Sequence, residues 1–148
     1  MMRGSSAVLV TLQLGLIAVI VLGTSWPVSP RAWPPAIFLL AMSLVLFAWT
    51  LGHNRPGNFS VFPEPRRSAR LVTSGPYRWI RHPMYVAVLL GAAAFTAADP
   101  RAWRVAAWLA LTAVLFVKAT REEGHLLSIF PEYADYAART KRFIPFVL

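Results

Sequence analysis

The chain alternates between long apolar stretches and polar ones, and the apolar stretches have the length of membrane-spanning helices. Residues 5–23 and 34–51 contain no charged side chain. At about 1.5 Å of helix per residue, each can cross a hydrocarbon core of about 30 Å. Residues 102–118 form a third stretch, with Arg104 near one end and Lys118 at the other. Because a long cationic side chain near a helix end can reach toward water, we expect Arg104 to snorkel.

A fourth apolar stretch, residues 83–98, is uncharged but short, at roughly 24 Å of helix. Its length is compatible with a full crossing, with a partly re-entrant helix, and with a helix capped by other protein segments. The pattern predicts an all-α integral membrane protein with four transmembrane helices, or five. All 148 residues form a single membrane domain in this interpretation.

The composition supports this class. Of the residues, 57% are hydrophobic and 14% charged, and the mean hydropathy is +0.52, which leaves too little polar surface for a soluble domain of this size. The first apolar run follows Arg3, as it would in a secretory signal. It is long for such a signal, however, and Gly23-Thr-Ser-Trp26 is a poor cleavage site, so we expect a retained helix.

Basic residues are concentrated on one side of the predicted helices. If the N-terminus is inside, that side receives every Lys and Arg except Arg31, Arg101 and Arg104. The positive-inside rule then places both termini in the cytoplasm, and the Ala/Arg-rich composition suggests a bacterial cytoplasmic membrane. Topology and attraction to anionic membrane lipids account for the net charge of +9, so we do not expect a nucleic-acid partner.

Two polar segments lie on the predicted cytoplasmic side. Residues 52–82 contain enough Pro and Gly to prevent a continuous helix, and a segment of this length in so small a protein is more often functional than idle. Residues 119–148 continue the helical pattern of the preceding span as far as Pro131. We expect a second short helix over residues 132–141, which makes this segment an amphipathic cap.

Candidate chemical groups gather where the third and fourth predicted helices reach this side. They include His82, with arginine and tyrosine neighbours, and the adjacent pair Glu122 and Glu123. Taken singly, such residues anchor a helix at the interface, form a solvated helix face, or begin a helix before proline. A structural role alone explains their combination less well, because ionisable groups near membrane depth are energetically costly and are usually paired or functional.

Other kinds of site are not indicated. The chain has no cysteine, which excludes thiolate ligands and a cysteine nucleophile, and we expect no metal site. It also lacks a Walker or Rossmann glycine pattern and a persuasive Ser-His-Asp order.

Residues 74–85 (SGPYRWIRHPMY) resemble the (S/T)GPYRxxRHPxY signature of the isoprenylcysteine carboxyl methyltransferase family. Residues 121–126 (REEGHL), followed by Phe130, two tyrosines and the RFIP of residues 142–145, resemble the family's second signature, EExxLxxxFGxxYxxYxxxxxRxIP. Asn58-Phe-Ser60 and residues 71–73 also match bacterial members. The resemblance covers about residues 54–146. Pro131 departs from the usual Gly, and the extra N-terminal helices of the larger eukaryotic enzymes have no counterpart here.

The resemblance implies an S-adenosylmethionine-dependent methyltransferase without a Rossmann domain, which releases S-adenosylhomocysteine. Carried over residue by residue, the cofactor site comprises Tyr77, Arg81, His82, Pro83, Tyr85, Glu122, Glu123, Tyr133 and Tyr136. Glu122 or Glu123 would hold the ammonium of the methionine moiety, and Tyr133, Tyr136 and Arg142 would close a lid. Arg142 or Arg121 is the candidate for presenting a substrate carboxylate in line with the methyl group.

The favoured acceptor is the carboxylate of a lipophilic small molecule or a lipid-modified substrate, which would enter sideways from the membrane. A phospholipid N-methyltransferase would share the cofactor motif but would need a deprotonated amine. A reductase of the sterol-reductase type has a larger helix set than 148 residues allow. A non-catalytic scaffold that binds anionic lipid is the alternative from another class. The sequence leaves the oligomeric state open.

Overall fold

The computed structural model describes residues 2–25, 28–54, 58 and 70–145. Residues 55–57 and 59–69 of the predicted polar segment 52–82 therefore lie outside the described residues, and these include Phe59 and Ser60 of the upstream match. The last three residues of the cap lie outside them too.

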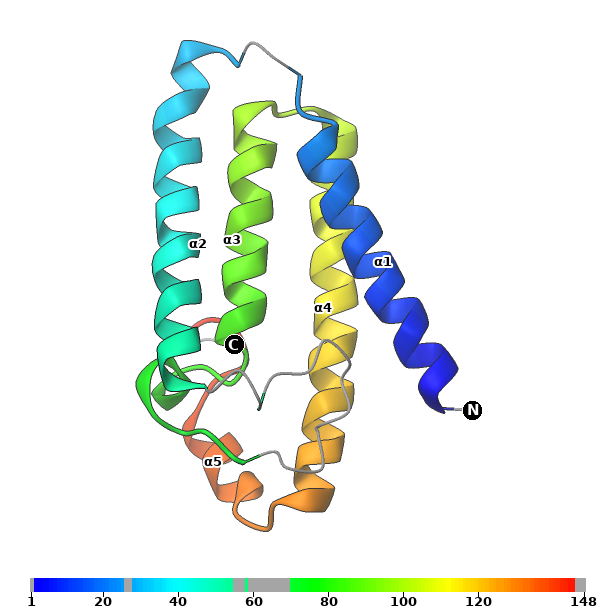
Figure 1. Ribbon diagram of the computed structural model, residues 1–148, viewed down its shortest axis with the longest axis vertical. Coiled ribbons are helices and arrows are strands. Elements are labelled where there is room, and N and C mark those ends of the chain that lie inside the picture. Colours follow the sequence, from blue (N-terminus) through cyan, green and yellow to red (C-terminus); the bar gives the residue numbers. More distant parts are fainter. Residues whose placement is uncertain (1, 26–27, 55–57, 59–69, 146–148) are drawn as a thin grey trace.

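Four long helices form the body of the molecule, and short elements gather at one of its ends (Figure 1). In chain order the elements are α1 (Met2–Leu22), η1 (Pro30–Ala32), α2 (Trp33–His53), η3 (Gly75–Arg78), α3 (Pro83–Ala98), α4 (Ala102–Ile129) and α5 (Tyr133–Arg139). The α1–α2 and α3–α4 connections lie at the opposite end from α5 (Figure 1). The described residues contain no strand, and the prediction of an all-α membrane protein is confirmed.

Three of the helices are long and apolar enough to cross a membrane: Gly4–Leu22, Pro30–His53 and Ala102–Ile129. Helix α3 is apolar but has only 16 residues. It lies beside α2 (Figure 1), and small side chains let the two backbones approach closely. The Ser43 hydroxyl of α2 donates to the Ala87 carbonyl of α3 at 2.7 Å, and a Cβ on Gly91 would lie 3.1 Å from the Ser43 oxygen.

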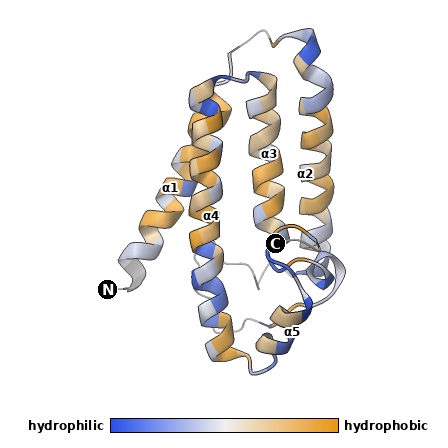
Figure 2. Ribbon diagram, turned by 180° about the vertical axis from the view of Figure 1, so that it is seen from behind, coloured by the Kyte–Doolittle hydropathy of each residue, from blue (hydrophilic) through white to orange (hydrophobic). Residues whose placement is uncertain are grey.

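Helix α4 is longer than the membrane core. Its 28 residues make about 42 Å of helix, against about 30 Å of hydrocarbon. Figure 2 shows the change along it, from mostly hydrophobic in the bundle to hydrophilic in the part that extends toward α5. Glu122 and Glu123 lie in this extending part, so α4 carries them beyond the apolar region.

The expectation that Arg104 snorkels was wrong. Its side chain is fully buried and donates to the Ile20 carbonyl at 2.6 Å, the Thr24 hydroxyl at 2.7 Å and the Phe95 carbonyl at 2.7 Å. Ile20 and Phe95 belong to the last turns of α1 and α3, where carbonyls have no partner within their own helix. Arg104 turns inward because it caps two helix ends at once.

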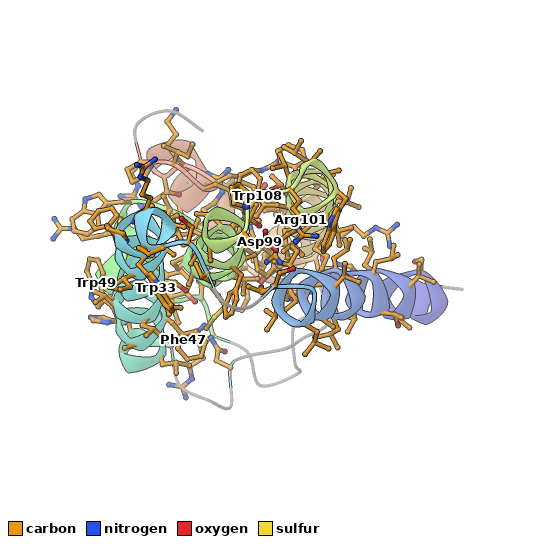
Figure 3. The ribbon with its side chains drawn as sticks, turned by 90° about the horizontal axis from the view of Figure 1, so that it is seen from above. Trp33, Phe47, Trp49, Asp99, Arg101 and Trp108 are labelled. Atoms are coloured by element: carbon orange, nitrogen blue, oxygen red, sulfur yellow. The ribbon has the colours of Figure 1, made fainter. Side chains whose placement is uncertain are left out.

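Asp99, at the α3–α4 connection, joins Arg104 in a cluster of polar groups at this end of the bundle. Its carboxylate accepts from the Ser25 amide at 3.1 Å and from Arg101 Nε at 3.1 Å, and it lies 3.7 Å from Arg104 Nη1. The view from above places Asp99 and Arg101 near the end of α1, while Trp33, Phe47 and Trp49 lie along α2 (Figure 3). The cluster fixes α1 to the α3–α4 hairpin.

The orientation in the membrane can be tested directly, because the chain has no cysteine of its own. We expect a membrane-impermeant maleimide to label Ser29→Cys in intact cells and Thr73→Cys only after permeabilisation, since the positive-inside rule places residue 73 in the cytoplasm. Both positions are exposed. The reverse labelling pattern would show that the termini are outside.

Replacing Arg104 should weaken the bundle. Arg104→Met leaves two helix-end carbonyls without their donor and Asp99 with Arg101 alone, and breaking a buried charged cluster from one side costs about 3–5 kcal/mol. Arg101→Met is the matched control, because the Arg101 side chain is 54% exposed and an exposed pair contributes about 0–1 kcal/mol. Circular dichroism melts in detergent should show a large decrease in Tm for Arg104→Met alone; equal decreases would refute the capping role.

Candidate active site

A short backbone pairing joins the two sequence motifs. Ile80, just before α3, forms a parallel bridge with Lys141, just after α5. The Arg81 amide donates to the Lys141 carbonyl at 2.7 Å, the Lys141 amide to the Trp79 carbonyl at 3.0 Å, and the His82 amide to the Arg142 carbonyl at 3.1 Å. The C-terminal cap is therefore attached to the start of α3 along three consecutive hydrogen bonds.

The turn before α3 aims His82 at α4. Gly75 adopts φ +60°, and a Cβ there would lie 2.4 Å from the His53 ring, so this position requires glycine. Pro83 is the first residue of α3, where proline's missing N–H has no cost, and His82 is the N-cap. The His82 carbonyl accepts from the amides of residues 85 and 86, which fixes its backbone at the start of α3, and the imidazole is held by its contact with Glu123 and by stacking on Tyr85.

The Glu123 carboxylate collects three cationic or polar side chains from separate parts of the chain. Its Oε1 accepts from Arg81 Nε at 2.8 Å and contacts His82 Nε2 at 3.1 Å, and its Oε2 accepts from Arg142 Nη2 at 2.7 Å. These four residues are called the Glu123 cluster below. Burial alone would raise the pKa of Glu123, but the hydrogen bonds from His82, Arg142 and Arg81 outweigh it and lower the pKa to about 2.

Arg81 also holds the end of α5. Its Nη1 donates to the Ala137 carbonyl at 2.9 Å and to the Thr140 carbonyl. These groups lie at the C-terminal end of the helix, where carbonyls need outside donors and a cation is favoured. One guanidinium thus connects α5 to the carboxylate on α4.

The neighbouring Glu122 is in a different situation. Its Oε2 accepts from the Tyr85 hydroxyl at 2.8 Å and lies 3.6 Å from His82 Nδ1. The Glu122 side chain is 32% exposed, against 10% for Glu123. The His82 ring stacks on Tyr85 with centroids 5.2 Å apart and an angle of 7°. The sequence did not distinguish the two glutamates, whereas the structure gives one a full set of donors and leaves the other partly open.

Three tyrosines meet where α5 of the cap contacts η3. Tyr133 and Tyr136 make an edge-on contact at 5.7 Å, the Tyr136 hydroxyl donates to the Tyr77 carbonyl at 2.8 Å, and the Tyr77 hydroxyl accepts from Asn54 at 2.9 Å. Burial raises the pKa of Tyr77 to about 12 and raises the pKa values of Tyr133 and Tyr136 as well, so all three stay neutral. The Tyr133 hydroxyl is buried and has no hydrogen-bond partner among the described residues.

Arg121 is not brought to this cluster. It is exposed, and its Nη1 donates to the Ser5 hydroxyl of α1 at 2.9 Å. Arg142 is at the cluster, but its guanidinium is occupied by Glu123 and lies 5.1 Å from the Phe116 ring centroid. Adjacent residues on a helix point about 100° apart, so Arg121 and Glu122 face different neighbours.

Sequence reasoning missed several residues at the site. Phe143 packs 5.8 Å from the His82 ring, Asn54 holds Tyr77, and Lys118 lies 5.4 Å from the Tyr85 ring centroid. The sequence could have indicated Lys118, because it lies four residues before Glu122 and therefore on the same face of a helix. Within the described residues, no group of three His, Asp or Glu side chains is placed to hold a metal ion.

A comparison with protein families identifies the group. A model described as phospholipid methyltransferase matches residues 34–133, which is more than half of the chain. The chain belongs to the phospholipid methyltransferase family. It is therefore related to membrane methyltransferases, and the matched region runs from α2 through the start of α5 and includes the whole α3–α4 hairpin.

Two curated bacterial proteins are similar to part of the chain. Over 88 residues, the chain is 42% identical to the nickel-cobalt-cadmium resistance protein NccN of Alcaligenes xylosoxydans xylosoxydans and 45% identical to the cobalt-zinc-cadmium resistance protein CzcN of Cupriavidus metallidurans. The match covers 58% of this chain and 41% and 40% of those proteins. The chain thus spans about two fifths of the length of these relatives.

Membership in a methyltransferase family implies S-adenosylmethionine as methyl donor, and the residues at the site fit it. The ligand's amino-acid moiety carries an ammonium, for which the partly exposed Glu122 carboxylate is a suitable partner. The buried Tyr133 hydroxyl offers a hydrogen bond that no described residue uses. The stacked His82 and Tyr85 rings provide flat apolar surface beside that carboxylate.

Neutralising Glu123 should loosen the cap. Glu123→Gln removes the charge that Arg81 and Arg142 share, so we expect a loss of about 3–5 kcal/mol and faster proteolysis after α4. Because the native pKa of about 2 lies below the ordinary 4.5, the carboxylate contributes stability above about pH 4.5 that is lost as the pH falls toward 2. The variant should lack that slope in detergent melts. The exposed Glu132→Gln is the control, and an unchanged Tm for Glu123→Gln would contradict the role assigned to the cluster.

Proposed function

We propose that this protein is an integral membrane S-adenosylmethionine-dependent methyltransferase that O-methylates the carboxylate of a lipophilic, isoprenylcysteine-like acceptor. Family membership supports the reaction class. The observation that carries the proposal is the unequal environment of two adjacent carboxylates at the end of α4. Glu123 is saturated by donors of the protein, and Glu122 keeps an exposed part beside an aromatic pair.

In this proposal Glu122 holds the cofactor's ammonium. His82, Pro83 and Tyr85 line the pocket, and Tyr133 and Tyr136 cover it from α5, with the Tyr133 hydroxyl directed to the ligand. Arg81, Glu123 and Arg142 are positioning residues, because their contacts orient His82 and hold the cap closed. Tyr77 acts in the same way, by linking Asn54 of the α2 end to Tyr136.

The chemistry places few demands on these side chains. The bound cofactor supplies a methyl group whose bond to a sulfonium breaks as the acceptor's oxygen forms the new C–O bond, so that an ester and a neutral thioether result. A carboxylate acceptor arrives deprotonated and needs no base. The protein's part is therefore to position two ligands and to exclude water, which the closed cap over His82 and Glu122 favours.

Acid–base groups at the site support a carboxylate over an amine. An amine must lose a proton in the course of methylation, and His82 is the natural base. Both ring nitrogens of His82 face carboxylates, with Nε2 at 3.1 Å from Glu123 and Nδ1 at 3.6 Å from Glu122. A base held in this way is poorly placed to accept a proton from an acceptor.

Phospholipid N-methylation is the second candidate, and the description of the matching family model favours it. The cofactor site would be the same, with Glu122 on the cofactor's ammonium, and only the acceptor would differ. We place the site and both termini at the cytoplasmic face in either case, because the basic residues favour that orientation and the cofactor is soluble. The acceptor would enter from the lipid.

Removing the charge of Glu122 should weaken cofactor binding more than it weakens the fold. For Glu122→Gln we expect S-adenosylhomocysteine to bind 10- to 100-fold more weakly, since a hydrogen bond to a charged group is worth about 1.5–3 kcal/mol. Calorimetric titration of the detergent-purified protein measures this, with Glu132→Gln as the control. If the unaltered protein fails to bind at millimolar ligand, the methyltransferase proposal is wrong.

The acceptor class can be read from the product. Membrane lipid extracts incubated with the protein and tritiated-methyl cofactor should yield label that mild base releases, because a methyl ester hydrolyses. Label that survives base treatment and stays with an amine headgroup would favour N-methylation instead.

A further inference from the structure

An apolar cavity lies at the end of the bundle that carries the α1–α2 and α3–α4 connections, opposite α5 (Figure 1). Its volume is about 220 Å³, and it lies between the first turns of α2, the end of α3 and the chain just after α1. Its wall is apolar, because the Thr24 hydroxyl that borders it is engaged elsewhere, with the Ile20 carbonyl at 3.3 Å and with Arg104 at 2.7 Å. A ligand that fits this cavity is therefore a hydrocarbon.

The cavity is open on its α2 side and has room for part of a lipid chain. Ile37 and Leu40 border it and are 57% and 38% exposed, whereas Ala36 and Ala94, which also border it, are buried. An apolar cavity of about 150 Å³ stays dry and takes up apolar ligands of the size of benzene. The larger cavity in this protein therefore accommodates a segment of a hydrocarbon chain, while the rest of the chain stays in the bilayer.

The depth of the cavity matches one leaflet of the membrane. The candidate span Pro30–His53 has 24 residues, of which a hydrocarbon core of about 30 Å takes about 20. When the core is centred on this span, Trp33 lies near its boundary and Leu40 near its middle. The cavity extends from Trp33 to Leu40, which is about 10 Å of helix, against about 15 Å of hydrocarbon in each leaflet. An acyl chain of a lipid in this leaflet is thus at the right depth.

One arginine at this end of the bundle has no anionic partner. Arg104 is taken up by helix-end carbonyls, and Arg101 pairs with Asp99. Arg31, in η1 immediately before α2, is exposed, and its side chain forms no ion pair with any residue that the structure describes. With the core centred as above, Arg31 lies at the level of the lipid headgroups, where a guanidinium pairs well with a phosphate.

We propose that this cavity binds one acyl chain of an anionic membrane phospholipid, whose phosphate pairs with Arg31. The chain lies against the first turns of α2 and the end of α3, and the headgroup lies beside η1. Burial of hydrocarbon supplies the affinity, and the charge of Arg31 favours a lipid with net negative charge over a zwitterionic one. The inference does not depend on the proposed reaction, which belongs to the opposite end of the bundle.

The bound lipid also packs against the residues that fix α1. Thr24 and Phe95 border the cavity, and both accept hydrogen bonds from the buried Arg104. The chain therefore fills space between the end of α1, the start of α2 and the end of α3. Because it binds the folded protein and has no such site on the unfolded chain, it should raise the Tm.

The test uses the full chain in detergent and two lipids that differ only in their headgroups, phosphatidylglycerol and phosphatidylcholine. Each carries a photoreactive diazirine in the middle of one acyl chain, and peptide mass spectrometry after illumination identifies the residues that carry lipid. We expect phosphatidylglycerol to concentrate its adducts on residues 33–40 and 94–98. The comparably exposed Leu44 and Val45, farther along α2, should carry few adducts.

Substitutions separate the charge from the cavity. Arg31→Gln should reduce the phosphatidylglycerol adducts about fivefold, the factor expected for one arginine near a charged lipid, and change the phosphatidylcholine adducts less than twofold. Arg78→Gln is the matched control, since it neutralises an exposed arginine at the other end of the bundle, and it should leave both unchanged. Filling the cavity with Ala98→Leu, or from its exposed rim with Ile37→Trp, should remove the adducts of both lipids.

Thermal melts give a second readout. Phosphatidylglycerol should raise the Tm of the unaltered protein more than phosphatidylcholine does, and Arg31→Gln, which changes only an exposed side chain, should abolish the difference. Adducts spread evenly along α2, equal labelling by the two lipids, or an Arg31→Gln protein that keeps its preference for phosphatidylglycerol overturns the proposal. If neither filling variant folds, the adduct positions and Arg31→Gln decide by the same criteria.

Discussion

A carboxylate buried at the edge of a membrane must find cationic partners, and in this protein Glu123 finds them in two separate segments. Arg81 and His82 lie 42 and 41 residues before it, and Arg142 lies 19 residues after it. Without these partners, a charge on a side chain that is only 10% exposed would be costly. Satisfying it brings together the start of α3, the end of α4 and the strand-like pairing at Lys141, and these segments enclose the candidate site.

The two ends of the bundle manage buried charge in different ways. At the α3–α4 connection, Arg104 is taken up by backbone carbonyls of α1 and α3, with Asp99 nearby, and the result is a structural clamp. At the opposite end, Arg81, His82 and Arg142 surround Glu123, and Glu122 keeps an exposed portion. Only the second arrangement leaves a carboxylate available to a ligand, which is why the proposed chemistry lies there.

Much of the architecture was predictable from single stretches of sequence. Apolar runs of suitable length predicted the long helices, and the continued pattern after residue 118 predicted that α4 would extend beyond the span. The motif around His82 and the pair Glu122 and Glu123 were also found at sequence level. The difference between the two glutamates was not, because neighbouring residues share a composition but point about 100° apart and meet different segments.

The different roles of the arginines could not be predicted for the same reason. Arg104, Arg121 and Arg142 are equally basic in the sequence, yet one caps helix ends, one bonds Ser5, and one neutralises Glu123. The sequence by itself determined which segments are apolar, where helices begin and end, and which residues are able to carry charge, since these are local properties. Only the tertiary structure decided which charges cancel and which stay available, because pairing depends on segments brought together by packing.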